Sequence, residues 1–264
     1  MNKTLILILT VWTSTVFGQT DLKKYFDSFG LKGSTTIYDY KNKRWIYTDK
    51  QDAMAATLPA STFKIPNSLF ALEYNVVQDE NEIFKWDGET RSHLGTVVEA
   101  WNKDTDLKSA FKNSTIWFYV KIAETVGRNQ YKTTLRRCRY GNNTYSEPGT
   151  DFWNYGEFAT TPKNQIKFLI RLYENRLPFS KTTLDKVKEI MITEKNEAHT
   201  YRDKTGWTRK NGTDIGWWVG YVEKRDNVYF FATRLLKDEN DNNKDFLKNR
   251  KEITKLILHE VEKQ

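Results

Sequence analysis

The stretch "PASTFKIPNSLFALEY", residues 59–74, decides the fold and the chemistry that this sequence predicts. Pro59 and Ser61 mark a helix start and "SLFALEY" supplies an apolar body, so we expect a helix over Ser61–Tyr74. Pro66 is tolerated only near a helix start, which makes the first turn tight or 3₁₀-like. Lys64 follows Ser61 by three residues and therefore lies on the same helix face one turn later.

This spacing suits a nucleophilic serine that has a lysine as its base. A serine hydroxyl needs a base within hydrogen-bond reach, and the positive end of the helix favours the negative charge that then develops. An ammonium group is no base, but burial lowers the pKa of a lysine. We expect Lys64 to be buried by apolar neighbours: Phe63, Ile65, Trp117, Phe118 and Trp153.

The spacing alone is weak evidence, because Ser109 and Lys112 repeat it in "SAFK". That second match lies in "NKDTDLKSAFKN", a charged stretch typical of a solvated helix surface. Ser61 precedes a strongly apolar helix instead. We therefore interpret Ser61 as the nucleophile and Ser109 as a chance match.

Strands are expected towards both ends of the chain and helices between them. Alternation in "STTIYDY" and "RWIYTD" predicts an early hairpin with its turn at Lys41–Lys43. Apolar periodicity, punctuated by Gly and Pro, predicts four further helices in the middle: Leu107–Phe111, Ser114–Thr125, Gln130–Cys138 and Pro162–Glu174. The last third predicts the strands Ala198–Thr205, Ile215–Glu223 and Val228–Leu235, then an amphipathic helix over Phe246–Val261 with Ile253, Leu256, Ile257 and Val261 on one face.

These elements predict an α+β fold with a mainly antiparallel central sheet, flanking helices and a helical insertion over about residues 75–177. Both ends of the chain contribute strands to this sheet. Ile215–Glu223 and Val228–Leu235 are nearly continuous in apolar residues, as expected for central strands covered on both faces. The cleft between the sheet and the insertion is a natural ligand site.

The first 18 residues have the pattern of a signal peptide. Lys3 gives a positive start, Leu5 to Trp12 an apolar core, and Gly18 a small residue before a cut ahead of Gln19. Val16 is larger than the residue usual at its position, but the apolar run is too short for a membrane anchor. We expect export to the periplasm and a mature catalytic domain over residues 19–264.

Charge and cysteine content indicate neither a nucleic-acid partner nor a disulfide. The 42 Lys and Arg are interleaved with 34 Asp and Glu, so the net charge of +8 reflects a solvated mixed surface. Cys138 is the single cysteine and is expected to be a packed helix residue. The isolated His93, His199 and His259 indicate no metal site. We expect no stable membrane association, and the sequence carries no signal for an oligomeric state.

Further short motifs follow Ser61 in a fixed order. "STI" occupies Ser114–Ile116, "YGN" Tyr140–Asn142, "DFW" ends at Trp153 and "KTG" occupies Lys204–Gly206. With this ordered set the sequence resembles the class D, oxacillinase-type serine β-lactamases, which share the fold of the penicillin-binding proteins. "FKWDG" at residues 84–88 and "WNKDTDLKSAF" from residue 101 also look like family sequence. The resemblance covers nearly the whole chain after residue 18.

The resemblance implies a covalent mechanism on penicillin-type β-lactams. Ser61 would attack the lactam carbonyl and become acylated, and CO₂ would carboxylate Lys64 to N6-carboxylysine, the general base for both half-reactions. Trp153 would donate its indole N–H to that carbamate, and Ser114 would shuttle a proton towards the leaving nitrogen. CO₂ or bicarbonate is the one small molecule implied besides the substrate.

The resemblance also implies a substrate-binding strand and an anion clamp. Lys204 and Thr205 would support the proton network and bind the substrate carboxylate, with Arg250 as the further clamp. Gly206 completes the K-T-G motif, and the backbone N–H groups of Ser61 and Trp207 would form the oxyanion hole. From its charged neighbours on a strand edge we expect Lys204 to stay charged, unlike Lys64. Tyr140–Asn142 is interpreted as a structural turn that lines the cleft.

Two other classes of protein remain open. A penicillin-sensing receptor domain resembles class D enzymes but stays acylated, and such domains carry a polar residue where this chain has Ile116. A penicillin-binding peptidase shares S-x-x-K and K-T-G but usually has S-x-N and a longer chain. The signal peptide and Ile116 both favour the hydrolase. Since the family usually has Val there, the extra methylene of Ile116 is expected to narrow the path of water or CO₂ to Lys64.

Overall fold

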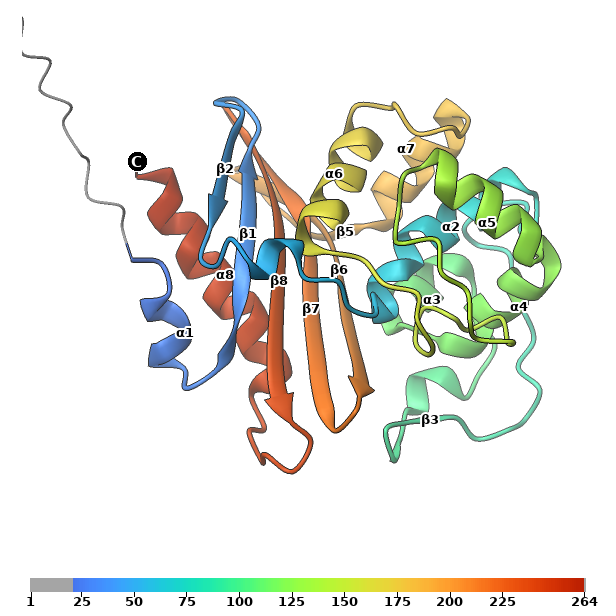
Figure 1. Cartoon of the computed structure of the whole chain (residues 1–264). Coiled ribbons are helices and arrows are strands. Elements are labelled where there is room, and N and C mark those ends of the chain that lie inside the picture. The colour runs from blue at the N-terminus through green and yellow to red at the C-terminus, as the bar shows by residue number, and fades with distance from the viewer. Residues whose placement is uncertain (1–20, 264) are drawn as a thin grey trace, which may run out of the picture.

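A six-stranded antiparallel sheet joins the two ends of the chain in the computed structural model, which describes residues 21–263 (Figure 1). The strands are β1 (Lys32–Asp39), β2 (Arg44–Tyr47), β5 (Ile192–Lys195), β6 (His199–Lys210), β7 (Thr213–Lys224) and β8 (Val228–Asp238), in the order β2-β1-β8-β7-β6-β5. Every neighbouring pair is antiparallel. The predicted α+β fold is therefore confirmed. The predicted signal peptide lies outside the described residues.

The predicted strands are all present, with shifted ends. The early hairpin and its turn at Lys41–Lys43 are confirmed. β6 continues five residues past Thr205, because Gly206 to Lys210 remain paired with β7. β5 was not predicted, since four residues are too few to show an alternating pattern.

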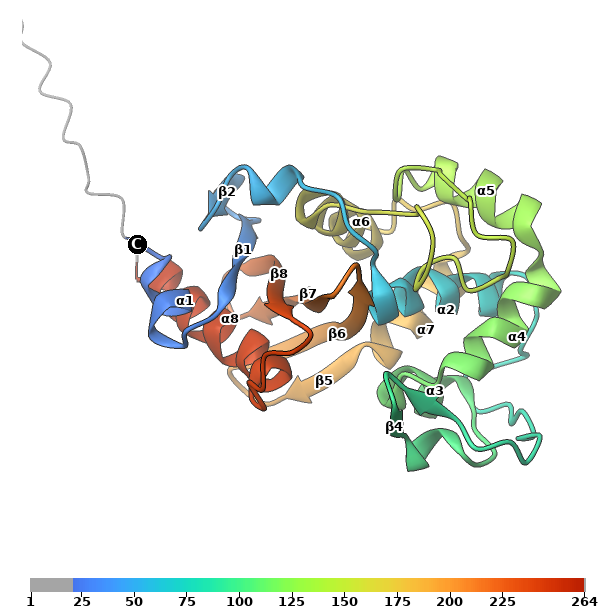
Figure 2. The ribbon, with the colours of Figure 1, turned by 60° about the horizontal axis from the view of Figure 1, so that its bottom comes forward.

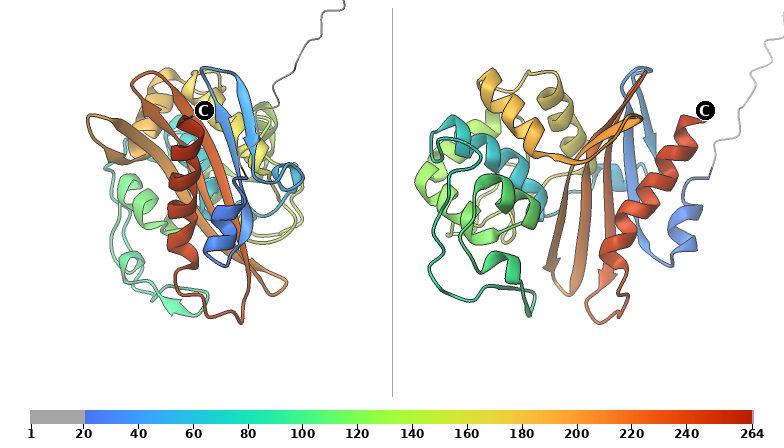
Figure 3. Two further views of the ribbon diagram at one scale, coloured as in Figure 1. Left: turned by 90° about the vertical axis from the view of Figure 1, so that its left-hand side faces the viewer. Right: turned by 180° about the vertical axis from the view of Figure 1, so that it is seen from behind.

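The central strands are covered on both faces, as their apolar sequences predicted. Residues 214–222 of β7 are all buried. One face carries α8 (Phe246–Glu262) and α1 (Lys24–Ser28), and the other carries α6 (Pro162–Tyr173) (Figure 3). Ile253, Ile257 and Val261 of α8 are buried as expected, but Leu256 is exposed because it lies off the i, i+4 stripe that they form.

The remaining helices form a lobe beside the β6 side of the sheet (Figure 2). They are α2 (Lys64–Glu73), α3 (Leu107–Asn113), α4 (Ile116–Val126), α5 (Arg128–Arg137) and α7 (Lys181–Ile190), with 3₁₀ turns η2 (Ala60–Phe63) and η3 (Glu99–Trp101) and a small hairpin, β3 (Ser92–His93) and β4 (Thr96–Val97). The 3₁₀ turn η1 (Asp52–Met54) lies instead against β1 and α6. The sequence signals of α7 were overlooked: Ser180 caps it, and Leu184 and Val187 are buried. Between Tyr47 and Ile192 the described chain contributes no strand to the six-stranded sheet. The exact boundaries of the helical insertion, residues 75–177, stay a prediction.

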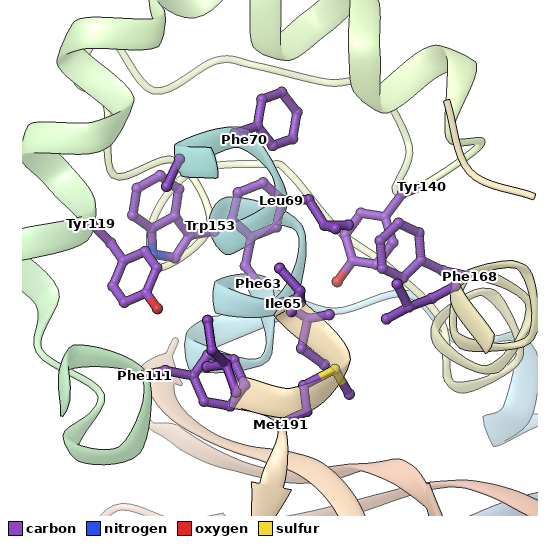
Figure 4. Packing of buried hydrophobic residues seen from close by; sticks show 14 of the residues in the cluster. Phe63, Ile65, Leu69, Phe70, Phe111, Tyr119, Tyr140, Trp153, Phe168 and Met191 are labelled. Carbon is purple, nitrogen blue, oxygen red and sulfur yellow. The ribbon is translucent and has the colours of Figure 1, made fainter. Parts of the chain in front are cut away.

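An aromatic core holds this lobe together. Phe63 lies at its centre, with the rings of Phe152, Trp153 and Phe158 at centroid distances of 5.3, 5.2 and 5.4 Å (Figure 4). Cys138 ends α5 in the same core, as predicted, and burial raises the pKa of its thiol to about 12. The thiol is therefore a packing group rather than a nucleophile.

The described residues contain no group of three or more His, Cys, Asp or Glu side chains arranged to hold a metal ion. Among residues 21–263, no helix is both long enough and apolar enough to cross a membrane.

Candidate active site

Ser61 lies in the sharp turn that enters α2. It belongs to the 3₁₀ turn η2, so the prediction of a tight first turn is confirmed. Ala60 immediately before it has φ of 51°, the left-handed region that costs a non-glycine residue energy. The Ala60 N–H donates to the Trp153 carbonyl oxygen at 3.1 Å, and this bond ties the turn to the loop that carries Trp153.

Lys64 is fully buried and touches Ser61, the predicted nucleophile. Its Nζ donates to the Ser61 Oγ at 3.0 Å, and none of its side chain is exposed. Burial lowers the pKa of Lys64 to about 7, against the charge of Asp151, which raises it. Phe63, Ile65, Trp117, Phe118 and Trp153 are all buried as predicted. Tyr119, which was not predicted, also lies against Lys64, with its ring centroid 5.1 Å from Nζ.

Trp153 presents a buried hydrogen-bond donor on the side of Tyr119, the ring whose centroid lies 5.1 Å from Lys64 Nζ. Its ring stacks on Phe63, the residue before Lys64, and its indole nitrogen lies on the side of the ring that faces Tyr119 (Figure 4). Within residues 21–263 this Nε1 has no hydrogen-bond partner, although the side chain is fully buried. A buried N–H without an acceptor costs free energy, and a carboxylate on the neighbouring lysine would supply one. The residues present therefore fit a carboxylated Lys64.

Ser114 occupies a strained turn between two helices. The prediction that it opens a helix is wrong, because α4 begins at Ile116 and Ser114 ends α3 with φ of 58°. The turn aims its hydroxyl at β6, where the Lys204 Nζ donates to the Ser114 Oγ at 2.6 Å. The two residues are 90 positions apart in the sequence.

Lys204 is buried, which its charged neighbours in the sequence did not indicate; that it is charged when it holds an anion stays a prediction. Its side chain is only 4% exposed, and its Nζ lies 5.6 Å from the ring centre of Phe111. Burial, followed by the charges of Lys64 and Arg250, holds the pKa of Lys204 well below its usual value. The prediction that Lys204 lies at the edge of a strand is correct, but the helical lobe covers this edge of β6. Both lysines of the site are thus desolvated before a substrate binds.

The free edge of β6 faces Ser61. β5 pairs with β6 only as far as Arg202, and from Lys204 onwards this edge packs against η2. In an antiparallel sheet, the N–H and the C=O of one residue both point towards the same neighbouring strand. The Trp207 N–H therefore points to the same side of β6 as the Trp207 carbonyl. That carbonyl accepts a bond of 3.2 Å from His93 Nε2, on the side away from β7. The Trp207 N–H is therefore directed into the cleft.

Gly206 allows β6 and the nucleophile turn to come close together. A Cβ at this position would lie 3.2 Å from the Ser61 nitrogen and 3.1 Å from the Pro59 carbonyl oxygen. Arg250, at the start of α8, donates from Nη1 to the Gly206 carbonyl oxygen at 3.0 Å. Burial lowers the pKa of Arg250 to about 10, and its Nε has no partner among the described residues. The guanidinium is therefore held at the strand with donor capacity to spare.

One cavity of about 150 Å³ brings six of the predicted residues together. They are Ser61, Ser114, Thr205, Gly206, Trp207 and Arg250, with Lys64 and Lys204 hydrogen-bonded directly behind the two serines. The cavity has four further wall residues: His93, Trp101, Ile116 and Leu247. His93 was interpreted as no metal ligand, and nothing in its local sequence indicates that its ring reaches the Trp207 carbonyl oxygen of β6.

Two other motifs behave as structure rather than chemistry. Tyr140 is buried, donates its hydroxyl to the Gln165 Oε1 at 2.9 Å and precedes Gly141, whose φ is 75°. The expectation of a turn is confirmed, although the turn does not line the Ser61 cavity. Ser109 and Lys112 lie on α3 and are also absent from the walls of that cavity.

The fold and this serine–lysine site define a domain of the penicillin-binding type. The family model of the penicillin binding protein transpeptidase domain matches residues 33–259. β-Lactamase OXA-2 of Salmonella typhimurium is 37% identical over 246 residues, which is 92% of this chain and 85% of that protein. β-Lactamase OXA-48 of Klebsiella pneumoniae is 37% identical over 234 residues, 89% of this chain and 85% of its own.

Solved structures narrow the class further. The crystal structure of a class D β-lactamase from Sebaldella termitidis superposes with a TM-score of 0.87 at 45% identity and covers 92% of this chain and 96% of its own. A class D β-lactamase from Nostoc gives a TM-score of 0.83 at 41% identity over 90% of this chain and 96% of its own. The protein belongs to the class D β-lactamases.

Proposed function

We propose that this class D β-lactamase hydrolyses the β-lactam amide bond of penicillin-type antibiotics through a Ser61 acyl-enzyme, with Lys64 carboxylated by CO₂ as the general base. β-Lactam hydrolysis, and with it antibiotic resistance, follows from the family. One observation carries the proposed chemistry. Lys64 is fully buried, bonded to Ser61 and close to the Tyr119 ring, and the Trp153 N–H on the side of that ring lacks an acceptor among the described residues. When present, the carbamate supplies a base that accepts the serine proton and later a proton from water.

The remaining groups support acylation from the other side of the cleft. Ser61 Oγ attacks the lactam carbonyl carbon, and the N–H groups of Ser61 and Trp207 stabilise the charge on the carbonyl oxygen. Cleavage of the C–N bond then needs a proton on the leaving nitrogen. Ser114 provides it and is resupplied by Lys204 at 2.6 Å.

The substrate carboxylate binds at the end of the cleft formed by Thr205 and Arg250. Its negative charge raises the pKa of Lys204, since an opposite charge favours the ammonium form. Lys204 is therefore loaded with a proton when a substrate is bound, and Ser114 can pass that proton on. The substrate side chain extends into a second cavity of about 480 Å³, which shares His93, Trp101 and Ile116 with the first.

The sensor alternative predicts a stable acyl-enzyme instead. Ile116 argues against it, because this apolar side chain lines both cavities where a sensor domain would have a polar one.

We also propose that the protein is exported to the periplasm after removal of residues 1–18. N-terminal sequencing of protein from a periplasmic fraction tests this: Gln19 is the expected first residue, and retention of Met1 would contradict it.

Turnover separates the enzyme from the sensor. Purified protein and an excess of benzylpenicillin are mixed in degassed buffer and in buffer with added bicarbonate, and ring opening is followed by absorbance. We expect many turnovers per molecule and a higher rate with bicarbonate. Ring opening that stops after one equivalent in both buffers would favour the sensor.

A further inference from the structure

We propose that a cavity between α3 and the edge of β6 binds a small organic anion of the carboxylate or phosphate type, and that this anion lowers turnover by acting on Lys204. This α3 cavity measures about 730 Å³, a size that suits an organic molecule rather than a single ion. It differs from the two cavities proposed for the substrate, although Thr205 belongs to the walls of both the α3 cavity and the Ser61 cavity.

The α3 cavity opens where β5 and β6 cease to pair. β5 begins opposite Arg202, so the edge of β6 beyond that residue is not covered by β5. Asp203, Lys204 and Thr205 of this edge form part of the wall. α3 contributes five further wall residues: Asp106, Lys108, Ser109, Phe111 and Lys112. The second serine–lysine match of the sequence, Ser109 and Lys112, thus lies at a cavity other than the catalytic one.

The acids in the wall of the α3 cavity are already matched by the protein. All three have partners: Asp106 accepts from the Ser109 N–H at 2.6 Å, Glu189 pairs with Arg202 at 3.2 Å, and Asp203 pairs with Lys251 at 3.6 Å. Asp203 is buried and also accepts a hydrogen bond from Thr193 Oγ1. These carboxylates therefore do not need a cation from a ligand.

Lys108 and Lys112 are cations without a counter-ion in the same wall. Across residues 21–263, neither side chain forms an ion pair or a hydrogen bond with the protein. They are four residues apart on α3 and therefore lie on one face of the helix. The wall holds four lysines against three acids, and Glu189 is matched by Arg202, which lies outside the wall. The surplus positive charge favours an anionic ligand.

Lys204 connects the α3 cavity to the catalytic cavity. It is only 4% exposed, and its Nζ donates to the Ser114 Oγ at 2.6 Å and to the Thr205 carbonyl oxygen at 3.1 Å. An ammonium group has three donors, so a third remains for a ligand in the α3 cavity. Such a ligand stabilises the ammonium and makes it a weaker acid.

The effect on turnover rests on the proposed function, in which Lys204 resupplies the Ser114 proton, whereas anion binding does not. A weaker acid at Lys204 delivers its proton to Ser114 more slowly. The substrate carboxylate is proposed to bind in the Ser61 cavity, so the two anions do not compete for one place. We therefore expect the anion to lower kcat and to leave KM nearly unchanged.

Calorimetric titration of the intact protein with phenyl phosphate tests binding. We expect saturable binding to wild type and a Kd about five- to tenfold higher for Lys112→Ala, because one charge-assisted hydrogen bond is lost. Lys108→Ala should weaken binding in the same way. Lys167→Ala removes the same charge from an exposed position on α6 and should keep the wild-type Kd.

Steady-state kinetics with benzylpenicillin at several fixed concentrations of phenyl phosphate test the action on Lys204. The kcat of wild type should fall severalfold as the probe saturates, while KM stays within about twofold. Lys112→Ala should need about five- to tenfold more probe for the same loss, in proportion to its Kd.

The other outcomes separate the parts of this proposal. No saturable binding to wild type, or one Kd for wild type and both α3 variants, would overturn the site. A rise of KM alone would place the anion on Thr205 and Arg250 in the Ser61 cavity and would also contradict the α3 cavity. Binding that depends on Lys112 but leaves kcat unchanged would refute the action on Lys204. A wild type that does not turn over benzylpenicillin would refute the proposed function, while the titration would still test the site.

Discussion

The indole N–H of Trp153 is a buried donor whose missing acceptor indicates a group that binds next to it. The side chain is fully buried and stacked on Phe63, so its placement is fixed by packing. Packing alone gives no reason for a donor that is unpaired within the described residues, since phenylalanine would fill the same space without the cost. The proposed carbamate on Lys64 would give that donor a partner and would account for a tryptophan at this position.

Trp153→Phe tests this reading at the residue scale. The variant keeps the stacked ring but loses the N–H, so we expect a folded protein whose penicillin turnover falls about 10- to 100-fold, as is typical when a supporting hydrogen bond to a functional group is removed. Added bicarbonate should recover part of the loss. The rate is measured across a bicarbonate series with Phe152→Leu as a packing control. A variant with wild-type turnover at every bicarbonate concentration would mean that the N–H is not used.

At the scale of elements, the site depends on the contact between β6 and η2. Gly206 permits this contact, because a side chain there would meet the backbone of Pro59 and Ser61. Backbone atoms cannot rotate aside as a side chain can. The distance between the nucleophile and the Trp207 N–H therefore depends on the absence of one methyl group.

Gly206→Ala is expected to push the strand from the turn by a few tenths of an ångström. The added methyl group should destabilise the fold by about 1–3 kcal/mol and lower kcat more than it raises KM, because the proposed oxyanion contact would act mainly in the transition state. Urea denaturation and steady-state kinetics measure the two effects. Gly212→Ala, in the β6–β7 turn at a φ of 74°, is the control that strains the backbone away from the site. Equal losses of kcat in the two variants would contradict the specific role of Gly206.

The elements themselves were largely readable from the sequence. The capping residue before Pro162–Tyr173 predicts a helix there, and the continuous apolar run over residues 214–222 predicts a central strand. What the sequence could not show were features produced by tertiary contacts. The left-handed backbone at Ala60 and Ser114 occurs at residues that do not prefer it, and the burial of Lys204 depends on a helix about 90 residues away. His93 enters the site in the same way, without a local motif.

For the molecule as a whole, the buried lysine of the site lowers the free energy of unfolding. Lys64 occupies the middle of an aromatic core, where an unmodified ammonium is poorly solvated. Functional sites commonly give up stability in this manner, and removal of the functional group then stabilises the protein.

Lys64→Met should therefore unfold at a higher urea concentration than wild type in bicarbonate-free buffer near pH 7. The pKa of Lys64 is about 7 in the folded protein against a usual 10.5, so the unfolded chain binds the proton more tightly. Wild-type stability accordingly rises with pH between these values, by about 1.4 kcal/mol per pH unit for this group. The advantage of the variant should shrink from pH 7 to pH 10, as urea midpoints at each pH would show. An advantage that does not change with pH would contradict the lowered pKa.

The most direct test of the proposed mechanism is the fate of the acyl group in Lys64→Ala. The variant is incubated with excess benzylpenicillin, and its intact mass is followed over time beside that of wild type. Without the lysine there is no base to activate water, so we predict a penicillin adduct on Ser61 that forms slowly and then persists, while wild type shows no lasting adduct. A Lys64→Ala protein that turns penicillin over at the wild-type rate, with no adduct accumulating, would contradict the role of Lys64.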